Sequence, residues 1–187
     1  MVTDAPKINW QYLYRSIPVY ESNGFKYIEV PWIVPATTTK ITFPQGNTEF
    51  KTPVGDLVGS AEQSFLYLIS QGKLPRGRYC SITPCFRSED HIDNLRRNWF
   101  MKLELIDTLN VSVSNLVEIT EICCSWMRSL LGDHPTIVQT DTEMFDIEYH
   151  GIEIGSYGIR NYPNFAPWIY ATGLAEPRFS QAKGLKA

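Results

Sequence analysis

One charged segment of the sequence, CFRSEDHIDNLRRNWFMKLE, combines arginine, carboxylate and aromatic side chains between two strand-like runs. Arg87 and Glu89 are two residues apart, so we expect them to project from the same face of the first strand. Phe100, Lys102 and Glu104 would share one face of the second strand for the same reason. The spacing therefore predicts a hairpin with a guanidinium, carboxylates and a ring on one wall.

Such a wall has the chemistry of a nucleotide site. An arginine can hold a phosphate through two parallel hydrogen bonds, and a carboxylate can accept a hydrogen bond from an exocyclic amine. An aromatic ring can stack on a base. The alternative is a solvated hairpin whose surface ion pairs contribute little to stability. The residue types alone leave both interpretations open.

The remaining sequence predicts helices that would hold this hairpin in place. The predicted helices span residues 8–23, 60–72 and 114–131. Pro18 should kink or shorten the first helix. Ser60 and Gln63 form a capping-box pattern at the start of the second, and Ser114 is the expected cap of the third. Each helix has an apolar face that could pack on a sheet.

The strand signals outnumber the helical ones. The predicted strands lie at residues 25–30, 78–86, 98–109, 136–138, 144–150, 152–159 and 166–172. Residues 36–58 are rich in Thr, Gly and Pro and are predicted to form loops with short strands. Consecutive strands joined by hairpin-type turns favour an α+β fold, in which helices flank an antiparallel β-sheet. A chain of 187 residues suffices for one such domain, residues 1–187.

Composition excludes several classes of protein. A net charge of −3 gives no overall basic surface, so nucleic acid would have to meet a local patch. The four cysteines include no Cys-x-x-Cys pair and the three histidines are scattered, which disfavours a zinc site and fits reduced thiols. No apolar run approaches the length of a membrane span, and the first residues contain no signal-peptide core. We therefore expect a soluble, cytoplasmic protein with no membrane partner.

The charged segment resembles motif 2 of the class II aminoacyl-tRNA synthetases, which reads Phe-Arg-x-Glu, a loop, and then Arg-x-x-x-Phe. In that family the first arginine binds the α-phosphate of ATP and the amino-acid carboxylate. The glutamate reads the adenine amino group, a basic loop residue reaches the γ-phosphate, and the phenylalanine stacks on adenine. The resemblance assigns these roles to Arg87, Glu89, Arg96 and Phe100. Arg97 is an alternative to Arg96, and Glu104 completes the predicted ATP-binding set.

Two further segments resemble the other motifs of this family, in the right order. GFKYIEVP, residues 24–31, is similar to motif 1, which forms the dimer interface and so implies a homodimer. TGLAEPR, residues 172–178, is similar to motif 3, whose last arginine contacts the γ-phosphate; this gives Arg178 an ATP-binding and catalytic role. Ala175 stands where the motif has its second glycine and Pro177 where it has an acid. The alanine puts the shape of the pocket in question.

The segment FDIEYHGIEIGSYGIRNY is similar to a strand pair of aspartyl-tRNA synthetases and ammonia-dependent asparagine synthetases. The resemblance implies that Glu153 holds the Mg²⁺ bound to ATP and that Arg160 pairs with the side-chain carboxylate of aspartate. An alternative for Arg160 is a structural ion pair with Glu148 or another neighbour in the sheet. Glu62 or Gln63 could accept a hydrogen bond from the substrate ammonium group.

The implied reaction is attack of an amino-acid carboxylate on the α-phosphorus of ATP, which yields an aminoacyl-adenylate and pyrophosphate. Arg87, Arg178 and Mg²⁺ would position the reactants and stabilise charge, and no general base is needed because a carboxylate is already ionised at pH 7. The acceptor would be tRNA or another nucleophile. Two alternatives are an asparagine-synthetase-like ligase and a non-catalytic paralogue used as a dimerisation or binding module. The expected molecule is a bare catalytic core with no anticodon-binding domain.

Overall fold

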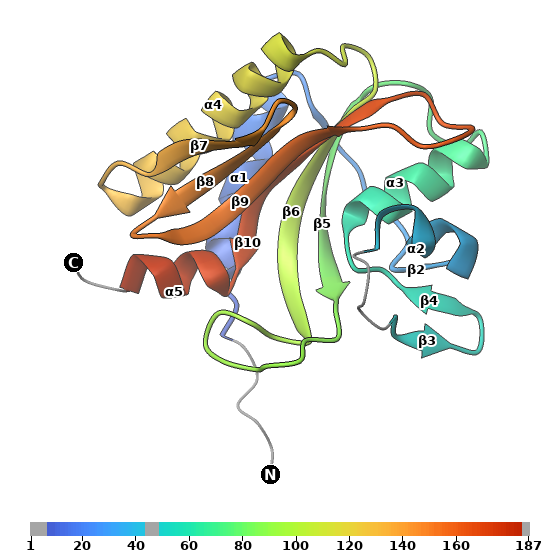
Figure 1. Cartoon of the computed structure of the whole chain (residues 1–187), viewed down its shortest axis with the longest axis horizontal. Coiled ribbons are helices and arrows are strands. Elements are labelled where there is room, and N and C mark those ends of the chain that lie inside the picture. Colours follow the sequence, from blue (N-terminus) through green and yellow to red (C-terminus); the bar gives the residue numbers. More distant parts are fainter. Residues whose placement is uncertain (1–6, 44–48, 185–187) are drawn as a thin grey trace.

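The computed structural model describes residues 7–43 and 49–184, which form a seven-stranded sheet, a small three-stranded sheet and five helices (Figure 1). The helices are α1 (Trp10–Ser22), α2 (Ala36–Thr42), α3 (Ala61–Ser70), α4 (Val113–Leu131) and α5 (Arg178–Gly184). The strands of the large sheet, in spatial order, are β1 (Lys26–Tyr27), β5 (Arg78–Phe86), β6 (Trp99–Asp107), β10 (Trp168–Glu176), β9 (Ile152–Arg160), β8 (Met144–Tyr149) and β7 (Thr136–Asp141). The small sheet contains β2 (Ile33–Val34), β4 (Gly55–Leu57) and β3 (Lys51–Thr52) in that order.

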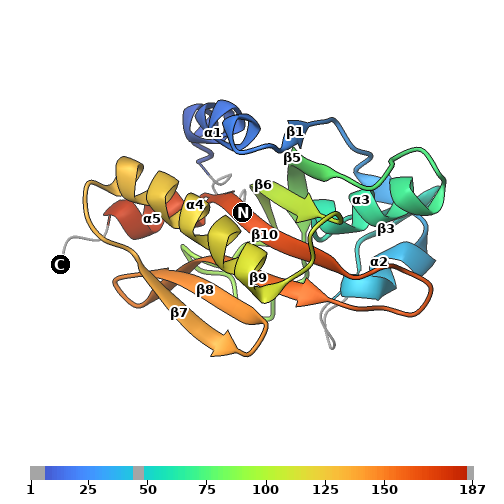
Figure 2. The same ribbon diagram turned by 90° about the horizontal axis from the view of Figure 1, so that it is seen from above.

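The two faces of the large sheet are covered unequally (Figures 1 and 2). On one face α1, α4 and α5 pack over a continuous apolar core, in which Leu13 and Leu116 meet Leu103 of β6. On the other face α3 covers one side, where Phe65 packs on a second core that includes Ile106 and Trp168. No helix of the described residues covers the rest of that face. This leaves the middle of β6, β9 and β10 available to line a site.

The predicted α+β class is confirmed, with one difference in strand direction. Every neighbouring pair in the large sheet is antiparallel except β1 with β5, which pairs in parallel through Lys26 opposite Tyr79. The strand predicted at residues 25–30 is therefore shorter than expected, and it lies at the edge of the sheet. The parallel pairing is possible because a long connection, which contains β2, α2, β3, β4 and α3, separates β1 from β5, and a parallel neighbour requires a crossover rather than a tight turn.

The predicted helices form, with local corrections. α1 continues through Pro18 to Ser22, so the expected shortening is wrong. The cap of α4 is Ser112 rather than Ser114, because the Ser112 hydroxyl accepts from the Asn115 amide at 3.3 Å. Gly132 ends α4 in the left-handed conformation at φ 75°.

Helix α2 was not predicted, because its sequence ATTTKIT is rich in threonines, which are weak helix formers. Tertiary contacts favour the helix over that preference. The Thr39 hydroxyl lies 3.0 Å from the Ala36 carbonyl oxygen and 3.0 Å from a carboxylate oxygen of Asp56 on β4. The short strands predicted within residues 36–58 are confirmed as β3 and β4.

Candidate active site

The second strand of the predicted hairpin presents its side chains as expected. β5 and β6 pair without interruption from Arg78 opposite Asp107 to Phe86 opposite Trp99. Phe100, Lys102 and Glu104 all line one cavity on the uncovered face of the sheet. The alternation of side chains along β6 therefore places these three residues on one face, as the sequence predicts.

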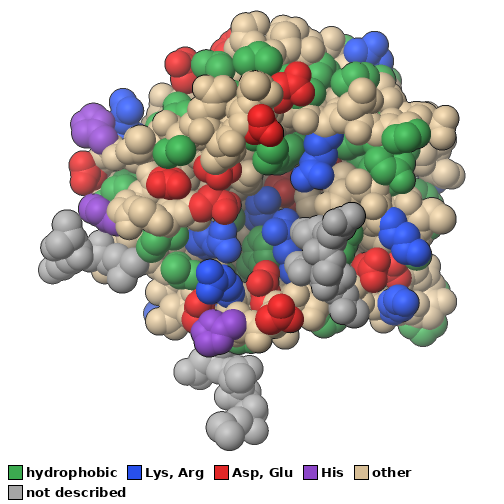
Figure 3. Space-filling view, viewed as in Figure 1, with side chains coloured by type: hydrophobic (Ala, Val, Ile, Leu, Met, Phe, Trp, Pro, Cys, Tyr) green, Lys and Arg blue, Asp and Glu red, His purple; other side chains and the backbone are tan. Residues whose placement is uncertain are grey.

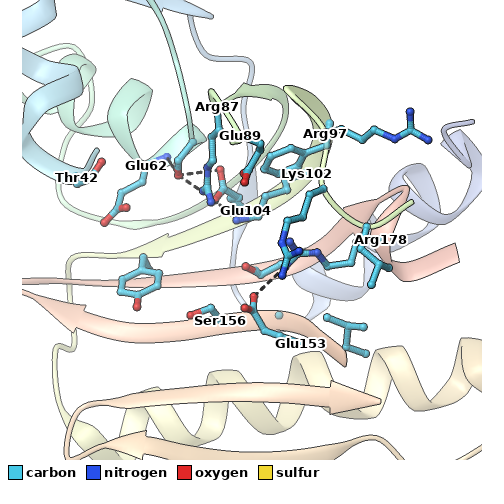
Figure 4. A pocket seen from close by; sticks show the side chains of 18 of the residues that line it. Thr42, Glu62, Arg87, Glu89, Arg97, Lys102, Glu104, Glu153, Ser156 and Arg178 are labelled. Atoms are coloured by element: carbon cyan, nitrogen blue, oxygen red, sulfur yellow. Dashed lines mark hydrogen bonds and ion pairs between the residues drawn. The ribbon is translucent and has the colours of Figure 1, made fainter. Parts of the chain in front are cut away.

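Arg87 and Glu89 reach the same cavity from a different position. β5 ends at Phe86, so neither residue lies on the strand, and the predicted placement on it is wrong. The Arg87 amide still donates to the Asn98 carbonyl at 2.9 Å, and the Glu89 amide donates to the Asn98 side chain at 3.1 Å. These two bonds hold the first residues of the loop against β6. Both side chains line the cavity (Figure 4).

The cavity has a volume of about 300 Å³, and parts of the chain far apart in sequence line it. Its charged lining residues are Glu62, Arg87, Glu89, Arg96, Arg97, Lys102, Glu104, Glu153, Arg160 and Arg178. Six of these are cationic and four are anionic, an excess of two positive charges in a chain of net charge −3. Lys and Arg side chains gather at the central hollow in Figure 3. The cavity is thus a local basic patch on an acidic protein, as anion binding requires.

At one end of the cavity, arginines present their charge without strong internal partners. The Arg87 guanidinium lies 5.3 Å from the centroid of the Phe100 ring, and its Nε donates to the Gly59 carbonyl at 3.1 Å. Arg178 Nη1 lies 3.4 Å from Glu153 Oε1, and both side chains are partly exposed (Figure 4). Arg87, Phe100, Glu153 and Arg178, predicted from three separate segments, therefore meet in one place.

The two loop arginines differ in what they do. Arg96 is exposed and pairs with Asp93 at 3.3 Å, a contact within the loop itself. The Nε of Arg97 is buried, and no hydrogen bond in the described part of the chain satisfies it. Both residues line the cavity, and Figure 4 shows the Arg97 side chain directed away from Glu104 and Arg178, so its guanidinium would have to turn to reach a bound anion.

At the other end of the cavity, charges are paired with one another. Glu62 Oε1 accepts from the indole of Trp168 at 2.6 Å and lies 3.2 Å from Arg160 Nε, whose N–H is not aligned for a hydrogen bond. The Arg160 guanidinium stacks 4.5 Å from the centroid of the Tyr170 ring. Burial raises the pKa of Glu62, and the charge of Arg160 opposes that rise. The ion-pair partner of Arg160 is thus Glu62, a residue of α3, and not Glu148.

Glu104 anchors the start of α3 to the hairpin. It accepts hydrogen bonds from the Ser60 hydroxyl at 2.9 Å, from the Ala61 amide, and from Lys102 Nζ at 2.6 Å. Burial opposes ionisation, but Lys102 and the Ala61 amide outweigh it and lower the pKa of Glu104. Glu104 therefore fixes the cavity wall, and both its oxygens already have partners.

Gln63 lies behind the cavity wall and is not among the residues that line it. Its Oε1 accepts from the Gly59 amide at 2.8 Å and its Nε2 donates to the Thr39 carbonyl at 3.0 Å. The predicted contact with a substrate ammonium is therefore not possible without breaking these bonds. The capping prediction is half right, since Ser60 caps α3 but Gln63 binds Gly59 instead of Ser60.

The segment TGLAEPR forms a strand-to-helix junction, as predicted, with β10 ending at Glu176 and α5 beginning at Arg178. Ala175 lies opposite Lys102 in the sheet and is nearly buried, and it is not among the residues that line the cavity. The methyl group that replaces the second glycine is thus accommodated in a buried position outside the cavity lining. The departure from the motif does not obstruct the cavity.

Several lining residues had no signal in the sequence. Thr42, Ser156 and Tyr170 come from α2, β9 and β10, and they are brought together only by the pairing of the large sheet and the placement of α2. Tyr170 and Thr172 share a face of β10 by alternation, but their register against β6 could not be known beforehand. The register of β10 against β9, in which Trp168 lies opposite Arg160, places Tyr170 beside Arg160, and local spacing does not contain it either.

The described residues contain no ready-made metal site and no membrane-spanning helix. Within residues 7–43 and 49–184, no group of three or more His, Cys, Asp or Glu side chains could hold a metal ion by itself. Glu153 could still serve Mg²⁺, because this ion is usually bound by one or two carboxylates together with substrate phosphates. All four cysteines are buried and none is bonded to another. None of the helices in the described residues is long and apolar enough to cross a membrane.

Comparison of the sequence with family models gives no match, and no curated protein matches it either. Solved structures do match. Two structures of pyrrolysyl-tRNA synthetase from Desulfitobacterium hafniense have TM-scores of 0.71 and 0.70 at 16% and 15% identity. They match 97% of this chain and 70% and 71% of their own.

A cytoplasmic serine-tRNA ligase from Naegleria fowleri, solved with AMP, has a TM-score of 0.66 at 16% identity. It matches 92% of this chain, which spans about half of that protein, 52%. None of these three structures is an aspartyl or asparaginyl enzyme. At such low identity the likeness establishes architecture only. The chain has the α+β fold of class II aminoacyl-tRNA synthetase catalytic domains.

Proposed function

We propose that this protein activates an amino acid with ATP, forming an aminoacyl-adenylate and pyrophosphate. One observation supports this more than any other: Arg87, Glu89, Phe100, Glu153 and Arg178 line a single cavity although they come from three sequence segments. The fold, shared with tRNA ligases, agrees with a ligase reaction.

The nucleotide would lie along the β5–β6 hairpin. Its adenine would enter beside Phe100, where the ring now stacks with Arg87, and Glu89 would accept from the adenine amino group. Arg87 would bind the α-phosphate, and Arg178 with Arg97 the outer phosphates. Mg²⁺ held by Glu153 would neutralise phosphate charge when bound.

The chemical step needs orientation more than proton transfer. The attacking carboxylate is ionised at neutral pH, so the residues of the cavity have to align it with the α-phosphorus and stabilise the added negative charge. Arg87 is suited to both tasks, since its Nε is fixed by the Gly59 carbonyl at 3.1 Å and its other nitrogens face the cavity end that Phe100 lines. The pyrophosphate would leave towards Arg178.

The amino acid would occupy the end of the cavity lined by Glu62, Arg160 and Tyr170. Arg160 uses Nε towards Glu62, and no hydrogen bond in the described part of the chain occupies its two Nη atoms. These atoms could receive a carboxylate through a fork-shaped contact, so aspartate is the first substrate to test. Glu62 has a second oxygen, Oε2, for the substrate ammonium group.

ATP-pyrophosphate exchange with each amino acid in turn tests the proposal. We expect exchange with one amino acid or a small group, dependent on Mg²⁺. Repeating the assay with bulk tRNA or with ammonia identifies the acceptor, since tRNA charging and asparagine formation give different products. Folded protein that binds ATP but shows no exchange with any amino acid would leave a binding module instead of a ligase.

We also propose that a second copy of the chain covers an aromatic groove beside α1. The groove is lined by Trp10, Tyr14, Trp32 and Ile33 among others, and these four side chains are exposed by 36% to 59%. Exposed aromatic clusters of this kind are typical of interfaces, and the groove adjoins the motif-1-like strand β1 at the sheet edge.

Analytical ultracentrifugation tests the dimer. We expect a dimer at micromolar concentration that Trp32→Glu converts to a monomer. Val54→Glu is the matched control, because Val54 is 81% exposed and lies outside the groove. A monomeric wild-type protein would contradict this proposal without affecting the one on ATP.

A further inference from the structure

Two buried tyrosines hold the backbone of β10 just before its motif-3-like end. The Tyr20 hydroxyl on α1 donates to the Gly173 carbonyl at 2.7 Å, and the Tyr157 hydroxyl on β9 donates to the Thr172 carbonyl at 2.7 Å. Both tyrosines are fully buried, at 0% exposure. Two neighbouring carbonyls are thus bound by side chains from two different elements.

These carbonyls belong to a bulge in the sheet. Thr172 lies opposite Glu104 and Leu174 lies opposite Leu103, so Gly173 is an extra residue with no partner in β6. A bulge leaves backbone groups outside the ladder, and buried ones need another partner. The tyrosine hydroxyls supply it.

The bulge decides which side chains of β10 face the cavity. Side chains alternate along a strand, so one extra residue reverses the faces of all that follow. Thr172 lines the cavity, whereas Leu174, two residues on, is in the apolar core. Ala175 then lies on the Lys102 side of the sheet. Without the bulge Leu174 would face the cavity. Every later side chain of β10, up to the turn before Arg178, would also point to the opposite face of the sheet.

The space around Gly173 shows that Tyr20 packs directly on this bulge. A Cβ atom at Gly173 would lie 2.8 Å from Cε2 of Tyr20 and 2.6 Å from Cδ2 of Leu103, closer than real contacts allow. Burial raises the pKa of Tyr20 and of Tyr157 well above the ordinary value. The adjacent Cys123 thiol is also protonated, because burial raises its pKa to about 12. Both phenols therefore remain hydrogen-bond donors at neutral pH.

We propose that Tyr20 and Tyr157 are positioning residues, which fix the bulge at Gly173 and thereby direct Arg178 into the cavity. This rests on the proposed function in one respect, namely that ATP binds through Arg178. The tyrosines themselves do not line the cavity, so they act only through the backbone of β10.

The test compares Tyr20→Phe, Tyr157→Phe and the double variant in two backgrounds, with Arg178 and with Arg178→Ala. We expect the double variant to weaken ATP binding about tenfold with Arg178 present and less than about twofold in Arg178→Ala, because the effect passes through that side chain. Tyr79→Phe is the matched control, since its hydroxyl also donates to a backbone carbonyl, that of Pro75, at 3.1 Å. It should leave ATP affinity unchanged.

An equal loss of affinity in both backgrounds, or no loss in either, would overturn the proposal. Amide hydrogen exchange provides a readout that needs no ligand: exchange at residues 173–179 should rise in the single Phe variants while that of β5 stays constant. Unchanged exchange at residues 173–179 would also overturn it. A wild-type protein that binds no ATP would refute the proposed function and the role of Arg178 in it, and the exchange data would then decide whether the tyrosines fix the bulge.

Discussion

The two ends of the cavity differ in how their charges are balanced. At the hairpin end, no carboxylate within residues 7–43 and 49–184 forms an ion pair with Arg87, and no hydrogen bond there satisfies the buried Nε of Arg97. Arg178 makes a partly exposed contact of 3.4 Å with Glu153. At the end beside α3, Glu62 pairs with Arg160 at 3.2 Å. Glu104 pairs with Lys102 at 2.6 Å. The carboxylates of Glu62 and Glu104 are almost fully buried.

The difference indicates what each end is built to receive. A buried charge is costly unless it is paired, so the end beside α3 balances its charges within the fold. The hairpin end keeps an excess of cationic groups that a polyanion such as a triphosphate would neutralise. Binding at the first end would depend on shape and hydrogen bonds, and binding at the second on charge.

Replacing Arg87 should have the largest effect on the hairpin end. We expect Arg87→Ala to reduce ATP-pyrophosphate exchange about 1000-fold, as loss of a group that stabilises transition-state charge does. The melting temperature should change little, because the Arg87 side chain makes one hydrogen bond within the described residues, to the Gly59 carbonyl, and the backbone bond to Asn98 is kept in the variant. A lowered melting temperature with ATP binding retained would show that Arg87 is structural.

The pH dependence of stability tests the protonation of Glu176, the buried last residue of β10. Glu176 is buried, its Oε1 accepts from Ser180 at 2.8 Å and its Oε2 has no partner in the described residues. Burial raises the pKa of Glu176 to about 7 from an ordinary value of 4.5, against the opposing Ser180 hydrogen bond. The native state therefore retains this proton at a pH where the unfolded chain has lost it.

The contribution of Glu176 to stability is consequently complete below about pH 4.5 and is lost as the pH rises to about 7, by up to about 3 kcal/mol. Glu176→Gln should remove this decline, so that the variant is the more stable protein above neutral pH. Urea unfolding across this pH range measures it. Parallel curves for the wild type and the variant would contradict the assignment.

Breaking the ion pair beside α3 should affect stability more than nucleotide binding. Arg160→Met leaves the buried Glu62 carboxylate without the positive charge that opposes its burial, so we expect a loss of about 2 kcal/mol. The loss is moderated by solvent because the Arg160 side chain is 38% exposed. ATP affinity should not change. Urea unfolding and calorimetric titration with ATP measure the two quantities, and a large loss of ATP affinity would show that the two ends are not separate.

The loop arginines provide the smallest contrast. Arg97→Ala should weaken ATP binding about tenfold, since it removes a cationic side chain that no carboxylate of the described residues pairs with, whereas Arg96→Ala should weaken it less than about twofold. The exposed pair of Arg96 with Asp93 makes Arg96→Ala the natural control. Titration with ATP at constant salt compares them, and the opposite order would identify Arg96 as the phosphate contact.

The sequence by itself predicted what depends on local spacing. Strand β5 has the predicted bounds 78–86, α4 ends at residue 131 as predicted, and Phe100, Lys102 and Glu104 share a face. The alternation of a strand and the end of a helix are encoded within a few residues. The order of the motif-like segments also indicated the α+β class. These features need no knowledge of distant contacts.

Only the tertiary structure decided which of those residues act together. Helix α2 forms against the weak helical preference of its threonines because Asp56 and α3 hold it, and Gln63 is used by Gly59 and Thr39 instead of the cavity. Glu62 meets Arg160 although the two residues are 98 positions apart in the sequence, because α3 packs on β5 and β6 and shares a core with Trp168 of β10. The bulge at Gly173 sets the faces of β10 through contacts with α1 and β9. Register and helix placement are fixed by packing between distant segments, and local sequence patterns do not contain that information.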